Sequence, residues 1–132
     1  TKRDINFYIK EKFQESSKFT QIQISKIENV AKFLEEGYPR DYLIGNSEFY
    51  GRKYFVDQRV LIPRPETERL VEIIIESVGE TFNGKILDLG SGTGAIVLAL
   101  CNQLKEARGL GMDKSSEAIA LSRENLCLLN LW

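Results

Sequence analysis

Histidine is absent from the 132 residues of this chain, which excludes a histidine-based catalytic triad and histidine metal ligands within it. Cysteine occurs only twice, as Cys101 and Cys127, and two cysteines alone do not make a zinc site. Both lie among apolar neighbours in stretches expected to be helical. We therefore expect them to be small core residues in a reducing compartment.

The chain also lacks a long apolar run and an excess of charge of either sign. No hydrophobic segment approaches the length of a membrane span, and no apolar signal-peptide core follows the first residues. The formal net charge is −1, whereas a bare nucleic-acid binder would carry a basic excess. These absences favour a cytoplasmic protein with no membrane partner and no strong nucleic-acid signal.

The first part of the chain, residues 1–40, has the apolar periodicity of helices. Asp4 is expected to cap one helix, and a second is expected to begin at Thr20 or at Ser25. Both starts have the pattern of a capping box, because Gln or Glu follows three residues later. Gly37 is expected to end the second helix. Residues 1–40 are thus predicted to be the C-terminal part of an N-terminal helical domain.

Residues 41–66 are rich in aromatic and β-branched side chains and predict a β-hairpin linker. Residues 49–56 are expected to form the first strand, residues 57–59 the turn, and residues 60–62 the second strand, paired with the first. The prolines on either side of Arg64 keep that residue extended, and the second proline suits the first turn of a helix.

From residue 67 to the end, the order of predicted elements is strand, helix, strand, helix after an opening helix. Residues 86–89 predict a core strand, residues 95–104 an apolar helix buried against a sheet, and residues 109–113 a second parallel strand containing two glycines. Ser115 is expected to cap the last helix. This order indicates an α/β unit with a right-handed crossover, and two parallel strands need further strands for a stable sheet.

A glycine-rich turn joins the first of these strands to its helix and is the most informative feature of the sequence. Glycines at 90, 92 and 94 can adopt positive φ and let the backbone approach a ligand closely. The helix N-terminus that follows offers N–H groups to an acceptor. Asp113, at the end of the next strand, lies where a cofactor ribose presents its hydroxyls, with a helix cap as the alternative role. The pattern predicts a site for a nucleotide-type cofactor.

Three kinds of nucleotide site have a glycine-rich turn of this type. A phosphate-binding P-loop requires Gly-Lys-Ser/Thr, which the chain lacks at this turn. A dinucleotide fingerprint is met by Gly90, Gly92 and Ala95. An S-adenosylmethionine (AdoMet) site has an acidic residue two positions before a GxGxG turn, and Asp88 supplies it. Asp88 favours AdoMet, because a carboxylate can receive the methionyl ammonium but repels a pyrophosphate. The dinucleotide site and a turn without ligand stay open as alternatives.

Several segments resemble the HemK/PrmC-type methyltransferases. Residues 37–45, 48–52 and 60–68, the last containing the string PRPETE, are similar to the linker of that family. Residues 88–94 are similar to its cofactor motif, and Asp113 to the position that holds the ribose. These enzymes transfer a methyl group from AdoMet to the glutamine side-chain amide in the Gly-Gly-Gln loop of class I peptide-chain release factors, the proteins of translation termination.

The resemblance implies a helical N-terminal domain, a hairpin linker and a Rossmann-like AdoMet-dependent methyltransferase domain, of which residues 67–132 would be the first half. It implies AdoMet as the cofactor and a class I release factor as the protein substrate. The candidate cofactor-binding residues are Asp88, Gly90, Ser91, Gly92, Thr93, Gly94 and Asp113.

The chain departs from the family in three respects, one of which is a helical domain expected to be short at the front. The Asn-Pro-Pro-Tyr motif that grips the glutamine amide is missing, so no catalytic residue and no metal ligand is assigned. We therefore expect methyltransferase activity in the full-length parent and none in the chain as given. Gly109 and Gly111 lie where the family has a more apolar strand. Two alternatives are a nucleic-acid amino-methyltransferase with the same cofactor and a non-catalytic fragment or binding module.

Overall fold

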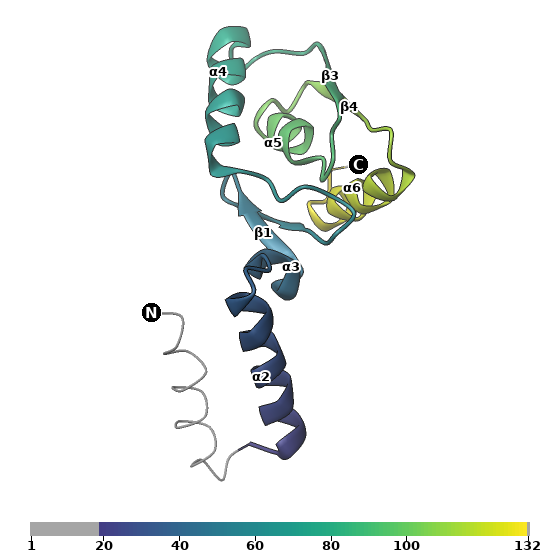
Figure 1. The fold of residues 1–132 in the computed structure, drawn as a ribbon. Coiled ribbons are helices and arrows are strands. Elements are labelled where there is room, and N and C mark those ends of the chain that lie inside the picture. The colour runs from purple at the N-terminus through teal and green to yellow at the C-terminus, as the bar shows by residue number, and fades with distance from the viewer. Residues whose placement is uncertain (1–18, 132) are drawn as a thin grey trace. The chain divides into compact units, whose positions relative to one another are not determined.

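The computed structural model describes residues 19–131, which belong to two compact units divided in the sequence between Leu43 and Ile44 (Figure 1). The helix predicted from Asp4 lies outside the described residues. Within the described part, no helix has the length and apolar character needed to cross a membrane.

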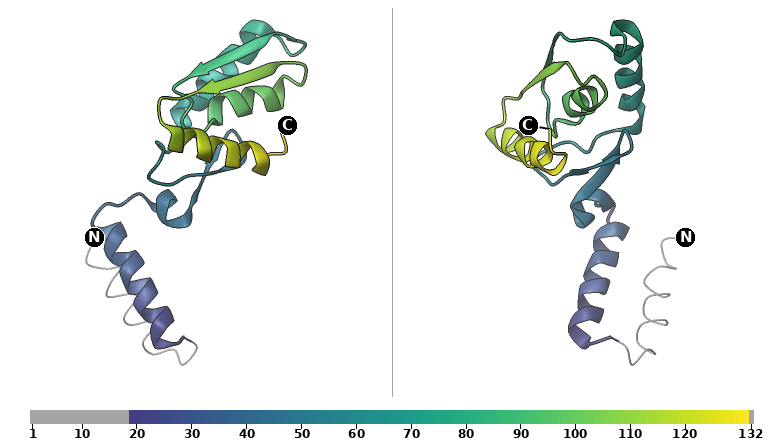
Figure 2. Two further views of the ribbon diagram at one scale, coloured as in Figure 1. Left: turned by 90° about the vertical axis from the view of Figure 1, so that its right-hand side faces the viewer. Right: turned by 180° about the vertical axis from the view of Figure 1, so that it is seen from behind.

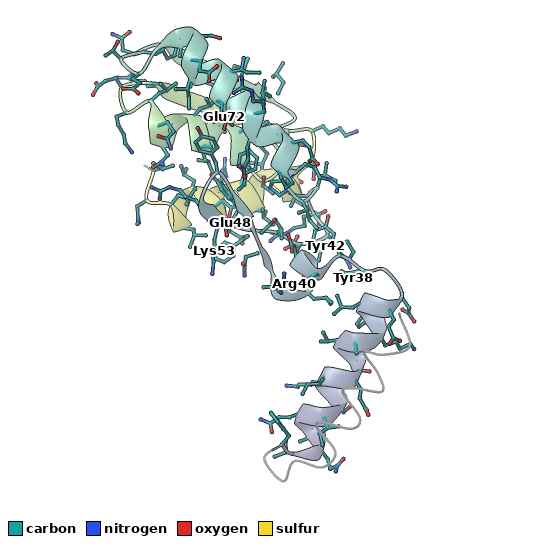
Figure 3. The ribbon with its side chains drawn as sticks, turned by 90° about the vertical axis from the view of Figure 1, so that its left-hand side faces the viewer. Tyr38, Arg40, Tyr42, Glu48, Lys53 and Glu72 are labelled. Atoms are coloured by element: carbon teal, nitrogen blue, oxygen red, sulfur yellow. The ribbon has the colours of Figure 1, made fainter. Side chains whose placement is uncertain are left out.

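The first unit contains α2 (Gln21–Glu35) and nearly all of α3 (Arg40–Ile44). Thr20 begins α2 with a capping box: the amide of Gln23 donates to Thr20 Oγ1 at 3.3 Å, and the amide of Thr20 donates to Gln23 Oε1 at 2.8 Å. Of the two predicted starts, Thr20 is therefore the correct one. Gly37 follows the helix with φ 85°, as a left-handed C-terminal cap requires. Figure 3 shows Tyr38 and Tyr42, whose ring centroids are 6.1 Å apart.

A β-hairpin opens the second unit, but its position differs from the prediction. Strand β1 (Asn46–Phe49) pairs antiparallel with β2 (Arg52–Phe55), and Glu48 lies opposite Lys53 in the register (Figure 3). The continuous strand predicted over residues 49–56 is wrong, because Tyr50 and Gly51 form a two-residue turn inside it.

The physical reason lies in the backbone of that turn. Tyr50 and Gly51 have φ of 49° and 69°, the pair of positive values that a tight hairpin turn requires. The predicted turn at residues 57–59 does exist, since the amide of Val60 donates to the carbonyl of Asp57 at 3.1 Å. Residues 60–62 form no strand after it, so the predicted pairing of these residues is also wrong.

The helix predicted after the two prolines is present. Arg64 is extended, with φ −94° and ψ 138°, as expected of a residue before proline. A single 3₁₀ turn, η1 (Pro65–Thr67), leads directly into α4 (Glu68–Val78). The prolines therefore set both the direction of the chain before the helix and the place where it begins.

The rest of the second unit alternates strands and helices as predicted. Its elements are β3 (Lys85–Leu89), α5 (Ala95–Gln103), β4 (Arg108–Met112) and α6 (Ser116–Leu128). The two strands are parallel and lie side by side (Figure 2). Helix α5 contacts both strands and also α4, so it lies between α4 and the sheet (Figure 1). This is the crossover expected of a strand, helix, strand unit.

Helix α5 forms the centre of the core, as its apolar sequence predicts. It buries Ala95 and the run from Val97 to Leu100. The opposite face of the sheet is exposed, and Leu89 on that face has a relative exposure of 72%. Of the two cysteines, Cys101 is partly buried beside α5's core residues, whereas Cys127 is exposed, so the prediction of a core position is wrong for Cys127.

The two glycines of β4 are explained by the close approach of α5. A Cβ atom at Gly109 would lie 2.5 Å from Cys101 Sγ and 2.5 Å from Val97 Cγ2. A Cβ atom at Gly111 would lie 3.0 Å from Ser91 Oγ. Glycine at these positions therefore leaves room for the helix and the loop, and the strand forms despite its low intrinsic propensity.

Candidate functional site

The glycine loop, residues 90–94, joins β3 to α5 at the carboxyl end of the sheet. Gly90, Gly92 and Gly94 have φ of 78°, 52° and 78°, which confirms the prediction of positive φ. The amides of Gly90 and Ser91 both donate to the carbonyl of Met112, at 2.7 and 2.9 Å. The beginning of the loop is thus fastened to the last residue of the neighbouring strand β4.

Asp113 follows β4 directly and holds the middle of the loop. Its Oδ2 accepts from the amide of Gly92 at 2.9 Å, and its Oδ1 accepts from the amide of Ser115 at 2.9 Å. These bonds, that of Ser115 first, lower the pKa of Asp113. The helix cap is Ser115, whose Oγ accepts from the amide of Ala118 at 3.2 Å. Because a carboxylate offers about four lone-pair sites, Asp113 keeps capacity for hydroxyl donors.

Asp88 lies in β3, one residue before the strand ends, and is partly buried. The backbone N–H of Val97, in the first turn of α5, lowers the pKa of this carboxylate. One of its oxygens, Oδ2, is buried and has no hydrogen-bond partner among the described residues. Burial raises the pKa of Asp88, and the nearby negative charge of Asp113 raises it further, while the Val97 amide opposes this rise. A buried carboxylate oxygen with an unused lone pair is suited to a cationic donor.

The N-terminus of α5 is less open than the sequence predicts. The amide of Ala95 donates to Thr93 Oγ1 at 3.2 Å, and the amide of Val97 lowers the pKa of the nearby Asp88 carboxylate. One of the N–H groups expected to meet an acceptor on a ligand therefore already has an acceptor within the protein. The carboxylate of Asp88 offsets the positive end of the helix dipole.

The side chains of Ser91 and Thr93 point into the protein and are 9% and 4% exposed. Ser91 Oγ, like Asp88 Oδ2, is buried without a hydrogen-bond partner among the described residues. The carbonyl of Thr93 accepts from Asn125 Nδ2 at 3.0 Å. All seven predicted residues thus lie at one edge of the sheet, at the ends of β3 and β4 and in the loop between β3 and α5.

Two residues outside the predicted site set bond the hairpin to the rest of the second unit. Asn125 on α6 is fully buried and bonds the loop to the hairpin, and Glu68 Oε1 accepts from the amide of Tyr50 at 2.9 Å, which ties α4 to the hairpin turn. A signal for Asn125 exists in the sequence. It lies four residues after Leu121 and seven after Ala118 on the buried stripe of α6, where a polar side chain needs a partner.

A family model and curated relatives both relate this chain to methyltransferases. Residues 66–131 match the family model described as Methyltransferase small domain, and the helices and parallel strands of the second unit fit an α/β methyltransferase fold. Among curated relatives, a release factor glutamine methyltransferase of Streptococcus pneumoniae is 46% identical over 105 residues. Another of that name, from Flavobacterium psychrophilum, is 39% identical over 114 residues. These alignments confirm the resemblance to the HemK/PrmC-type enzymes.

The alignments cover most of this chain and a smaller share of each relative. They include 80% of this chain and 37% of the Streptococcus relative, and 84% of this chain and 40% of the Flavobacterium relative. A Vibrio cholerae protein of the same name is 45% identical over 67% of this chain and 31% of its own length. The chain thus spans 40% or less of the length of these relatives.

Proposed function

The chain belongs to the methyltransferase small domain family, and on that premise we propose that its glycine loop, with Asp88 and Asp113, binds AdoMet as a methyl donor. The observation that carries the proposal is the buried Oδ2 of Asp88, which lacks a hydrogen-bond partner among the described residues. The methionyl ammonium of AdoMet would supply a charged donor to it.

The same geometry weighs against a dinucleotide. A pyrophosphate bound as in a dinucleotide fold needs the amides at the N-terminus of the helix after the glycine turn. Here the amide of Ala95 already has an acceptor within the protein, and the amide of Val97 acts on the nearby carboxylate of Asp88, whose pKa it lowers. A pyrophosphate at this position would meet the negative charge of Asp88, whereas an ammonium would be attracted by it.

The roles proposed for the remaining residues follow from their positions. Asp113 accepts the ribose hydroxyls with the lone pairs that Gly92 and Ser115 leave unused. The backbone of Gly90, Gly92 and Gly94 allows close approach of the ligand. Ser91 and Thr93 contribute to the shape of the loop, since their side chains are buried. AdoMet supplies the electrophilic methyl group, and the contribution of these residues is to hold and orient it.

For the complete protein, we infer methylation of the glutamine side-chain amide in the Gly-Gly-Gln loop of a class I peptide-chain release factor, in the cytoplasm. The curated relatives carry the name release factor glutamine methyltransferase, and the identity of 36–46% supports the inference. The proposed domain organisation has the end of a helical domain at residues 1–40, a hairpin linker at 41–66, and the first half of a Rossmann-like catalytic domain at 67–132.

Calorimetric titration of the complete protein with AdoMet and, separately, with NAD tests the cofactor. We expect AdoMet to bind and NAD to give no heat of binding. Binding of NAD in preference to AdoMet would contradict the proposal. A release factor incubated with labelled AdoMet tests the substrate, and we expect label on the glutamine of its Gly-Gly-Gln loop. The same assay on the 132-residue chain alone is expected to give no turnover.

A further inference from the structure

Asn125 joins three segments that are far apart in the sequence. It lies on α6 and has no exposed surface. Its Oδ1 accepts from the amide of Phe55 at 2.6 Å, and its Nδ2 donates to the carbonyl of Phe55 at 3.2 Å and to the carbonyl of Thr93 at 3.0 Å. One buried side chain thus bonds to the last residue of the hairpin and to the glycine loop.

Both N–H donors and the oxygen of the Asn125 side chain take part in these bonds. An asparagine amide has two N–H donors, and both are used, while its oxygen accepts from Phe55. At the end of β2, the amide group pairs with both backbone groups of Phe55 as a residue of a neighbouring strand would. Since the bonds are buried, loss of the amide would leave several backbone groups without partners.

A second contact joins α6 to the turn that follows the hairpin, and it is of a different kind. Arg59 Nη1 lies 3.1 Å from Glu124 Oε1, and this ion pair is partly exposed to solvent. Exposed ion pairs contribute little to stability, because water and salt screen them. The buried bonds of Asn125 therefore contribute more to the attachment of the hairpin end to α6 than this ion pair does.

The glycine loop is consequently held from two sides. On the side of β4, Asp113 accepts from the amide of Gly92 at 2.9 Å. On the side of α6, Asn125 donates to the carbonyl of Thr93 at 3.0 Å. The same side-chain amide that makes this second attachment is also held by two bonds to Phe55. The position of the loop is thereby linked to the docking of the hairpin on α6.

We propose that Asn125 is a positioning residue that makes AdoMet binding at the glycine loop depend on the docked hairpin. The proposal rests on the AdoMet site proposed above. In this proposal, the docked hairpin helps to set the conformation of the cofactor site. Asn125 does not touch the cofactor itself in this account and acts through Thr93.

The test compares Asn125→Ala with Leu121→Ala in the complete protein. Leu121 lies one helical turn earlier on α6 and is also fully buried, so its truncation creates a cavity without removing a hydrogen bond. We expect both variants to lower the thermal midpoint. Only Asn125→Ala is expected to weaken AdoMet binding, measured by calorimetry below both midpoints, by tenfold or more.

Amide resonances of the loop provide a readout that does not need the cofactor. In Asn125→Ala, the signals of Gly92, Gly94 and Phe55 are expected to shift together, whereas in Leu121→Ala those of the two glycines should keep their positions. Unchanged AdoMet affinity in Asn125→Ala, or equal weakening in Leu121→Ala, overturns the proposal. If the unsubstituted protein binds no AdoMet, the cofactor assignment fails, and these resonances still decide whether Asn125 positions the loop.

A double-mutant cycle tests the link to the hairpin. Gly51 has φ 69°, so Gly51→Val strains the hairpin turn without touching α6 or the loop. We expect Gly51→Val to weaken AdoMet binding in the unsubstituted background and to have a much smaller effect when Asn125→Ala is present. Equal effects in the two backgrounds would show that the hairpin and the loop are independent, and would overturn the coupling.

Discussion

The amide of Gly92 donates to the carboxylate of Asp113 across 2.9 Å, which holds the middle of the glycine loop against the end of the next strand. The two residues are 21 positions apart in the sequence. The bond gives the Asp113 carboxylate a fixed orientation before any ligand arrives. A pre-oriented carboxylate loses less freedom on binding, which is the reason to expect a large effect from its removal.

Asp113→Asn is expected to weaken AdoMet binding by about tenfold to a hundredfold. The substitution keeps the size of the side chain but replaces a charged acceptor, and hydrogen bonds to charged groups contribute about 1.5–3 kcal/mol. Calorimetric titration measures the affinity. Glu106→Gln is the matched control, because Glu106 is an exposed carboxylate in the segment before β4, at the opposite edge of the sheet. Unchanged affinity in Asp113→Asn would remove the ribose assignment.

Asp88→Asn is expected to stabilise the ligand-free protein at neutral pH and to weaken AdoMet binding. Burial raises the pKa of Asp88 in the folded state above its unfolded value. Its contribution to stability is therefore fully present below the unfolded pKa and is lost as the pH rises through the folded pKa. The asparagine side chain of Asp88→Asn does not ionise, so this loss of stability at neutral pH does not occur. Burying a neutral group costs less free energy than burying a charge.

Thermal unfolding from pH 7 down to pH 4 measures the effect of Asp88→Asn, and the gain in midpoint should shrink as the pH falls. Asp57→Asn is a control for which we expect the opposite change in stability at pH 7. The hydrogen bonds from Arg59 lower the pKa of Asp57, so its charged form stabilises the fold and the substitution should destabilise it at pH 7. A midpoint at pH 7 that is lower in Asp88→Asn than in the unsubstituted protein would contradict the prediction.

Gly109→Ala is expected to destabilise the second unit by about 1–3 kcal/mol, because overpacking a close contact forces neighbouring groups to move. The added Cβ would lie 2.5 Å from Val97 Cγ2. Urea unfolding measures the change. In a Val97→Ala background the same substitution should cost less, since the clashing methyl is gone. An equal cost in both backgrounds would indicate that the strand itself, and not the contact with α5, requires glycine.

Glu68→Ala is expected to destabilise the fold by about 1.5 kcal/mol, because Glu68 Oε1 accepts from the amide of Tyr50 at 2.9 Å. Hydrogen exchange at Tyr50 should become faster by a corresponding factor. Glu66→Ala tests specificity, since Glu66 lies in the same PRPETE string and is exposed. Similar losses in the two variants would mean that negative charge near the start of α4, rather than the bond to Tyr50, is responsible.

The elements after residue 84 could be predicted because their signals are local. The apolar pattern of α5 and the three glycines before it involve only neighbouring residues, and Ser115 caps α6 from an adjacent position. The same holds for the start of α2 at Thr20 and for the extended Arg64. Periodicity, caps and prolines act over a few residues, so a sequence displays them directly.

The hairpin was misplaced because its turn has a weak signal. Tyr50 is not among the residues that favour positive φ, and the aromatic residues around it predict a continuous strand. The bond from the Tyr50 amide to Glu68 supports the turn from 18 positions away. The local sequence pattern around Tyr50 gives no sign of this bond, because the bond forms only in the folded chain.

By itself, the sequence determined that a strand, a glycine turn and a helix would follow one another, and that Asp88 and Asp113 would lie at the same edge of a parallel sheet. Only the tertiary structure decided that Gly109 makes room for Val97, and that Asn125 bonds Phe55 to Thr93. The physical reason is the separation along the sequence of the groups that interact. Dihedral preferences and periodicity belong to adjacent residues, whereas packing and buried hydrogen bonds belong to groups that meet only after the chain has folded.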